Sequence, residues 1–128
     1  MKSLAAFLLC ALSLWSVDWL TDYDDALALS QESGKPMLVV IMRESCPYCR
    51  MLITDTLPSE PIDKLIAQAY IPVMLDTEAN PVNVAKSALR ANAVPASYIV
   101  QPNGVEKQML IGYRPPMEFM RFLQNGSN

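Results

Sequence analysis

A continuous apolar run from Met37 to Met42 leads directly to two cysteines, Cys46 and Cys49, which are separated by Pro47 and Tyr48. An uninterrupted apolar run of this length is typical of a central strand that is covered on both faces. Pro47 favours the first turn of a helix, because its fixed φ fits there and its missing N–H is not needed. The sequence therefore predicts a buried strand that ends just before a helix, with both sulfur atoms at the start of that helix.

The rest of the chain alternates between helix and strand signals. Apolar residues spaced three and four apart, Asp, Ser and Asn caps, and terminal glycine or proline predict helices. Short apolar runs between turn residues predict strands. The expected order is a helix from Asp22 to Gly34, the strand 37–42, helices 47–57 and 59–69, a strand 71–75, a helix 80–89 with Ala85, Ala88 and Leu89 buried, strands 96–101 and 105–111, and a helix from Pro115.

This order predicts an α/β fold built on a mixed four-stranded sheet with helices on both faces. The first two strands are joined through helices and should pair in parallel by a right-handed crossover. The tight turn at 102–104 predicts that the last two strands form an antiparallel hairpin. Pro72 near the start of strand 71–75 favours an edge position, because proline cannot donate to a neighbouring strand.

The first 16 residues resemble a secretory signal. Lys2 is followed by an uncharged, mostly apolar stretch with small residues near its end, and cleavage before Val17 would leave residues 17–128 as one domain. An uncleaved N-terminal membrane anchor is the alternative, although Asp18 arrives too early for a span of about 20 apolar residues. We therefore expect an exported, periplasmic protein, with Cys10 discarded and any membrane contact limited to this segment.

Composition excludes several classes of function. The chain has no histidine, which removes histidine-based catalysis and most zinc and haem sites. Its formal net charge is −3 with no basic cluster, so nucleic-acid binding is not expected. Two sulfur atoms alone do not complete a metal site, so no metal or other cofactor is expected.

The cysteine spacing predicts redox chemistry. Residues three apart at a helix start lie on the same face, and the helix N-terminus favours a thiolate at Cys46. A thiolate attacks disulfides, which makes Cys46 the predicted nucleophile and the more buried Cys49 the predicted resolving residue. A structural staple and half of a metal site are the alternatives. A staple across one turn would stabilise the fold by roughly 2 kcal/mol, against about 3 kcal/mol for a 15-residue loop.

The combination of Cys46-Pro47-Tyr48-Cys49 after a strand, Val94-Pro95 before a hairpin, and Gly112 after it resembles the thioredoxin superfamily. It is most similar to the secreted or periplasmic thioredoxin-like thiol:disulfide interchange proteins, over roughly residues 19–123. The resemblance implies a thioredoxin-like fold, a redox-active Cys46–Cys49 disulfide, a cis peptide bond before Pro95, and substrate binding by Val94, Pro95, Pro47 and Tyr48.

Three departures from that family concern the direction of electron flow. Ser45 stands where the family often has Trp, and Val40 stands where thioredoxins proper carry a buried Asp. Glu44 is an exposed substitute for that acid. The Pro-Tyr dipeptide is shared with glutaredoxins, but the Gly-Gly signature of that group is absent after the hairpin.

The predicted activity is disulfide exchange with protein thiols and disulfides, supplied by an upstream redox partner, in a monomer. A glutaredoxin-like enzyme that uses glutathione is one alternative. A non-catalytic thioredoxin-fold binding module is the other. The sequence does not set the redox potential, so it leaves the choice between reductant and oxidant open.

Overall fold

The computed structural model describes residues 17–127, and the predicted signal segment lies outside this part of the chain. The elements in chain order are α1 (Tyr23–Ser33), β1 (Met37–Met42), α2 (Pro47–Met51), the π-helical segment η1 (Leu52–Thr56), α3 (Glu60–Ala69), β2 (Ile71–Asp76), α4 (Pro81–Ser87), β3 (Ala96–Val100), β4 (Glu106–Ile111) and α5 (Pro116–Gly126).

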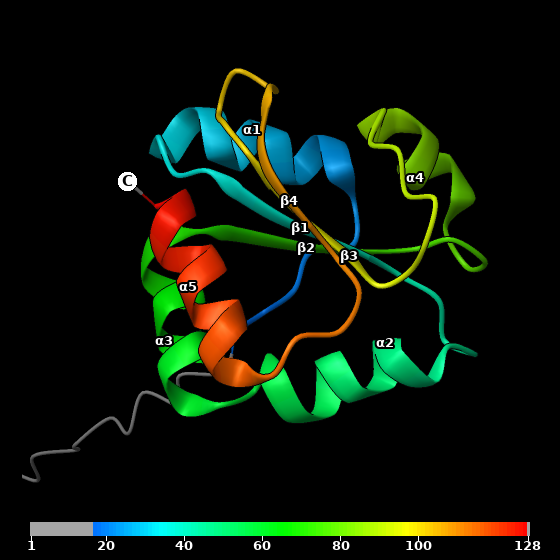
Figure 1. Cartoon of the computed structure of the whole chain (residues 1–128). Helices are drawn as coiled ribbons and strands as arrows, with labels where there is room; N and C mark the ends of the chain where they lie inside the picture. Colours follow the sequence, from blue (N-terminus) through cyan, green and yellow to red (C-terminus); the bar gives the residue numbers. More distant parts are fainter. Residues whose placement is uncertain (1–16, 128) are drawn as a thin grey trace, which may run out of the picture.

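The four strands form one mixed sheet in the order β2-β1-β3-β4 (Figure 1). Strand β1 pairs in parallel with β2 and antiparallel with β3, and β3 pairs antiparallel with β4. The predicted fold class, the parallel crossover and the hairpin are therefore confirmed.

Helices cover both faces of the sheet, with α1 and α4 on one face and α2, α3 and α5 on the other (Figure 1). Side chains alternate along β1, so that Leu38 and Val40 enter one core while Met37, Val39 and Ile41 enter the other. We call the first core the α2-side cluster; its buried members are Leu38, Val40, Leu52, Leu57, Ile62, Ile66, Tyr70, Ile99, Phe119, Phe122 and Leu123.

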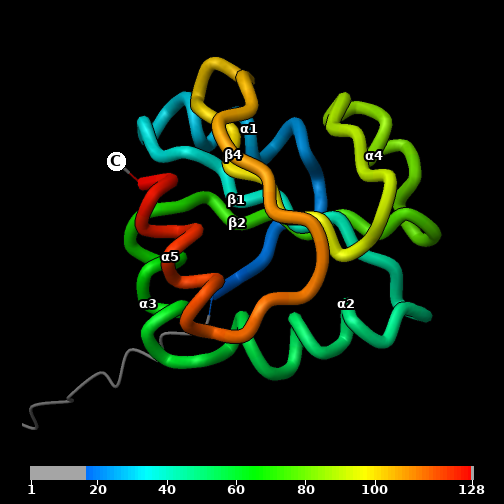
Figure 2. Tube along the Cα trace, viewed as in Figure 1, coloured from blue at the N-terminus to red at the C-terminus, as the bar shows by residue number. Residues whose placement is uncertain are grey.

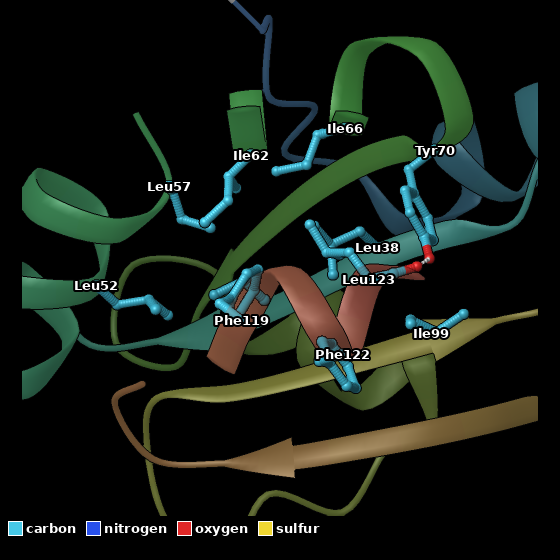
Figure 3. Packing of buried hydrophobic residues seen from close by; sticks show 11 residues of the cluster. Leu38, Leu52, Leu57, Ile62, Ile66, Tyr70, Ile99, Phe119, Phe122 and Leu123 are labelled. Atoms are coloured by element: carbon cyan, nitrogen blue, oxygen red, sulfur yellow. Dashed lines mark hydrogen bonds between the residues drawn. The ribbon is translucent and has the colours of Figure 1, made fainter. Parts of the chain in front are cut away.

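Figure 3 shows how the α2-side cluster closes over the sheet. The buried hydroxyl of Tyr70 donates a hydrogen bond to the carbonyl of Leu123 and joins α3 to α5. Gly126 ends α5 against the same region, where an added Cβ would lie 1.9 Å from Cδ1 of Ile99. The last turn of α5 can therefore pack here only because its final residue has no side chain.

Local signals explain the helix bounds. The Asp22 carboxylate accepts from the backbone N–H of Asp25 at 2.9 Å, and Gly34 closes α1 with φ of 74°. Helix α2 runs on into the π-helical η1, and the chain turns at Leu57 and Pro58, where the sequence predicts a break.

The prediction for α4 is wrong in its buried face. It fails at Ala85 and Ala88, which are exposed, whereas Leu89 is half-buried and packs against the core; the buried residues of the helix itself are Asn83 and Ser87. The helix ends at Ser87, and Ala88 adopts a left-handed conformation with φ of 55°. The Asn83 side chain accepts from the backbone N–H of Tyr23 at 2.9 Å, so a polar contact with α1 determines the orientation of this helix.

Strand β2 is an edge strand, as Pro72 predicts, and a short extended segment protects it. The Leu20 N–H donates to the Pro72 carbonyl at 3.0 Å, and the Met74 N–H donates to the Leu20 carbonyl at 2.8 Å. Over residues 17–127, no helix has both the length and the apolar character needed to cross a membrane.

Candidate redox site

Cys46 lies between β1 and α2, at the N-cap position of the helix. Its sulfur accepts a hydrogen bond from the backbone N–H of Cys49 at 3.3 Å. Strand β1 is buried and paired on both sides, and Pro47 begins the helix with a suitable φ. Two rigid elements therefore hold the sulfur of Cys46 at the end of the sheet.

The two cysteines differ in burial. Both are free thiols, Cys46 with 6% of its surface exposed and Cys49 with none. Cys49 lies one helical turn further into α2, on the side that faces the core. The structure thus brings together the predicted nucleophile and the predicted resolving residue, with only the first open to another molecule.

The same difference separates their pKa values. Burial raises the pKa of Cys46, but hydrogen bonds from the Cys49 side chain and from the N–H groups of Cys49 and Tyr48, together with the charge of Arg43, outweigh burial and lower it. Burial and the hydrogen bond to Cys46 raise the pKa of Cys49 to about 11. When one of the two thiols loses its proton, the pair therefore favours the thiolate on Cys46 over a thiolate on Cys49.

Figure 2 shows the path of the segment that joins α4 to β3, and Val94 of this segment lines one groove together with Cys46. The Val94–Pro95 peptide bond is cis, as the resemblance implies. The Cys46 thiol lies 3.7 Å from the Val94 carbonyl, to which it donates. The Gly112 N–H donates to the Pro95 carbonyl at 2.7 Å, so the end of β4 supports this loop.

A groove of about 320 Å³ runs beside the sulfur of Cys46. Arg43 and Thr77 form one part of its lining, and residues 91–94 form another. Tyr48 projects beside the pair with 62% of its surface exposed. Of the candidate substrate-binding residues, Val94 lines the groove with Cys46, Pro47 and Tyr48 are exposed directly after Cys46 in the chain, and Pro95 is buried.

Charged residues form the rim of the site. Arg43 lies 3.6 Å from a carboxylate oxygen of Glu78, and the Ser45 hydroxyl lies 3.3 Å from the same oxygen. The sequence analysis missed Arg43, whose only signal was its place three residues before Cys46. Glu44 is exposed at the rim rather than buried behind the cysteines.

The structure shows the surroundings of Val40, which stands where thioredoxins proper carry a buried Asp. Val40 lies opposite Ser97 of β3, on the face covered by α2. Ser97 is 1% exposed, and its hydroxyl has no hydrogen-bond partner among the described residues. Within the same part of the chain, no group of three Cys, Asp or Glu side chains could hold a metal ion.

Comparison with known proteins gives a consistent result. A family model described as thioredoxin-like matches residues 18–102. A thioredoxin from Thermus thermophilus has a TM-score of 0.73 at 24% identity, covering 84% of this chain and 85% of that one. The oxidised C-terminal domain of DsbD from Neisseria meningitidis has a TM-score of 0.65 at 16% identity, covering 85% and 99%.

A disulphide isomerase from Xylella fastidiosa Temecula1 is also similar, with a TM-score of 0.58 at 23% identity over 73% of this chain and 80% of that one. The comparison with curated proteins gave no match. At these identities the structural likenesses show the fold, and the family match covers most of the domain.

Proposed function

This chain belongs to the thioredoxin-like family, and from that premise we propose that it is an exported thiol–disulfide oxidoreductase that exchanges disulfides with protein substrates. The single observation that carries this proposal is the contrast within the cysteine pair. Cys46 keeps 6% of its surface exposed and has a lowered pKa, whereas Cys49 has no exposed surface and a raised pKa. A staple needs no such contrast, whereas a nucleophile and a resolving residue do.

In the reducing direction, the Cys46 thiolate attacks one sulfur of a substrate disulfide. The substrate disulfide breaks, and a mixed disulfide forms between Cys46 and the substrate. Cys49 then loses its proton and attacks the sulfur of Cys46, which releases the second substrate sulfur as a thiol. In the oxidising direction the same steps run in reverse.

The backbone beside Cys46 supports a polypeptide substrate. Val94 lies in van der Waals reach of the sulfur, and the groove continues along residues 91–93. An extended substrate segment could pair with this backbone while its cysteine meets Cys46. The exposed ring of Tyr48 offers an apolar contact on the other side of the sulfur.

Trapping experiments test the assignment of roles. Cys49→Ala should accumulate mixed disulfides with protein partners through Cys46, and Cys46→Ala should not. If the two variants trap partners equally well, the assigned roles are wrong. A disulfide that neither insulin nor dithiothreitol exchanges would contradict the enzyme reading and favour the binding module. Glutathione as the only accepted reductant would favour the glutaredoxin-like alternative.

A measurement of the redox potential of the Cys46–Cys49 pair decides the direction of electron flow. A value near −270 mV would indicate a reductant, and a value near −120 mV an oxidant. Export is tested separately, by fractionation and by N-terminal sequencing of the mature protein, which we expect to begin near Val17.

A further inference from the structure

Ser97 is a buried polar residue that the fold does not explain. Its hydroxyl lacks a partner among the described residues, although only 1% of the residue is exposed. The hydroxyl groups of the three other buried serine and threonine residues, Ser30, Thr56 and Ser87, each donate to a backbone carbonyl. Because burial of an unpaired hydroxyl costs stability, such a group in a native core needs a reason.

The strand register places this hydroxyl on the face of the sheet that α2, the helix of the cysteine pair, covers. Ser97 lies between Val40 of β1 and Leu110 of β4, on the face that α2 and η1 cover. It is two residues from Pro95, and therefore near the end of β3 that meets Cys46. Cys49 lies in the first turn of α2, which covers the same face, and is fully buried.

The resolving step needs a group of this kind. Burial keeps the Cys49 thiol protonated, and once Cys46 is bonded to substrate it no longer carries a negative charge. The titratable and charged groups around Cys49 are Cys46 and Arg43, with Tyr113 packed on the same cluster. None of these is a carboxylate, and the facing positions of β1 and β4 are Val40 and Leu110.

We propose that Ser97 is a positioning residue for resolution, whose hydroxyl donates a hydrogen bond through one bridging water to the Cys49 thiolate. The inference rests on the proposed function and adds a residue to its second step. The Cys49 proton passes to solvent, and the thiolate attacks the Cys46 sulfur. The Cys46–Cys49 bond forms, the bond from Cys46 to the substrate sulfur breaks, and the departing thiolate takes up a proton. The Ser97 hydroxyl is not consumed.

Ellman's reagent separates the two steps in one experiment. Cys46 of the reduced protein attacks the reagent and releases one coloured thiolate, at a rate proportional to reagent concentration. Cys49 then resolves the mixed disulfide and releases the second, at a rate independent of that concentration. A Cys10→Ser background removes the third thiol.

Two isosteric variants provide the matched comparison. Ser97→Thr keeps the hydroxyl, whereas Ser97→Val replaces it with a methyl group of similar size. We expect the second phase to be about three- to fourfold slower at pH 7 in Ser97→Val than in Ser97→Thr. A lost hydrogen bond to a thiolate raises its pKa by about one unit, which lowers the thiolate fraction about tenfold, while the more basic thiolate is about threefold more nucleophilic. The first phase should be equal in the two variants. Ser97→Ala should behave like Ser97→Val.

Each alternative outcome has a distinct meaning. Equal second phases in the two variants, or equal slowing of both phases, would overturn the role of Ser97. A first phase in the parent no faster than that of a free thiol would contradict the proposed function itself. Urea unfolding of each variant verifies the fold, and we expect Ser97→Ala to unfold at no lower urea concentration than the parent.

Discussion

The reactivity of Cys46 should depend on the side chain of Cys49, and this dependence can be measured. Burial raises the pKa of Cys46, and the hydrogen bond from the Cys49 side chain is the largest contribution that lowers it. Cys49→Ala removes that donor but keeps the backbone N–H, which lies 3.3 Å from the sulfur. The backbone N–H of residue 49 should therefore still lower the pKa of Cys46 in this variant, but by less than in the parent.

The size of the effect follows from the donor type. Hydrogen bonds to charged groups contribute about 1.5–3 kcal/mol, and a thiol is a weak donor, so we take a value at the lower end. One pKa unit corresponds to about 1.4 kcal/mol. The pKa of Cys46 should therefore rise by about one unit in Cys49→Ala.

Alkylation by iodoacetamide across a pH series gives this pKa directly, because only the thiolate reacts. Cys49→Ser is the matched control, since it keeps a hydroxyl donor at the same place and should give a smaller rise. The Cys10→Ser background ensures that Cys46 is the only reactive thiol. A pKa in Cys49→Ala equal to or below that of the parent would refute the proposed role of the Cys49 side chain.

Three further predictions concern charge, packing and pH. Arg43→Gln should raise the pKa of Cys46 by roughly half a unit, since an exposed charge acts weakly; Arg43→Lys should not, and an unchanged pKa in Arg43→Gln would contradict the effect. Gly126→Ala should destabilise the domain by about 1–3 kcal/mol in urea unfolding, because its Cβ overlaps the Ile99 side chain, and a neutral result would refute this packing. Burial raises the pKa of Tyr70 from 10.0 to about 12, so its contribution to stability is fully present below pH 10 and is lost as pH rises through 12. Tyr70→Phe should flatten this alkaline loss in urea titrations, and an equally steep loss in that variant would assign it to other groups.

The order of elements could be predicted from the sequence because each signal was local. The apolar run of β1, the proline at the start of α2 and the turn before β4 each act within a few residues. Pro72 predicted an edge strand correctly, since the reason is the covalent lack of an N–H. The two cysteines and their order of burial followed from the same local reasoning.

What could not be predicted depends on contacts between distant segments. The buried face of α4 is set by the Asn83 side chain, which bonds to a residue 60 positions away. Ser97 is one polar residue in an apolar strand, and its significance appears only when the register places it beside Val40. The charge of Arg43, in the turn between β1 and α2, lowers the pKa of Cys46, and no spacing rule identified that position from the sequence.

The two edges of the sheet are each protected in a different way. Leu20 occupies the backbone groups of β2, and β4 begins with exposed Glu106 and Lys107 beside a bulge at Ile99 and Val100. Charges and bulges at an edge oppose the addition of another strand. Both edges of the sheet therefore disfavour pairing with another extended chain.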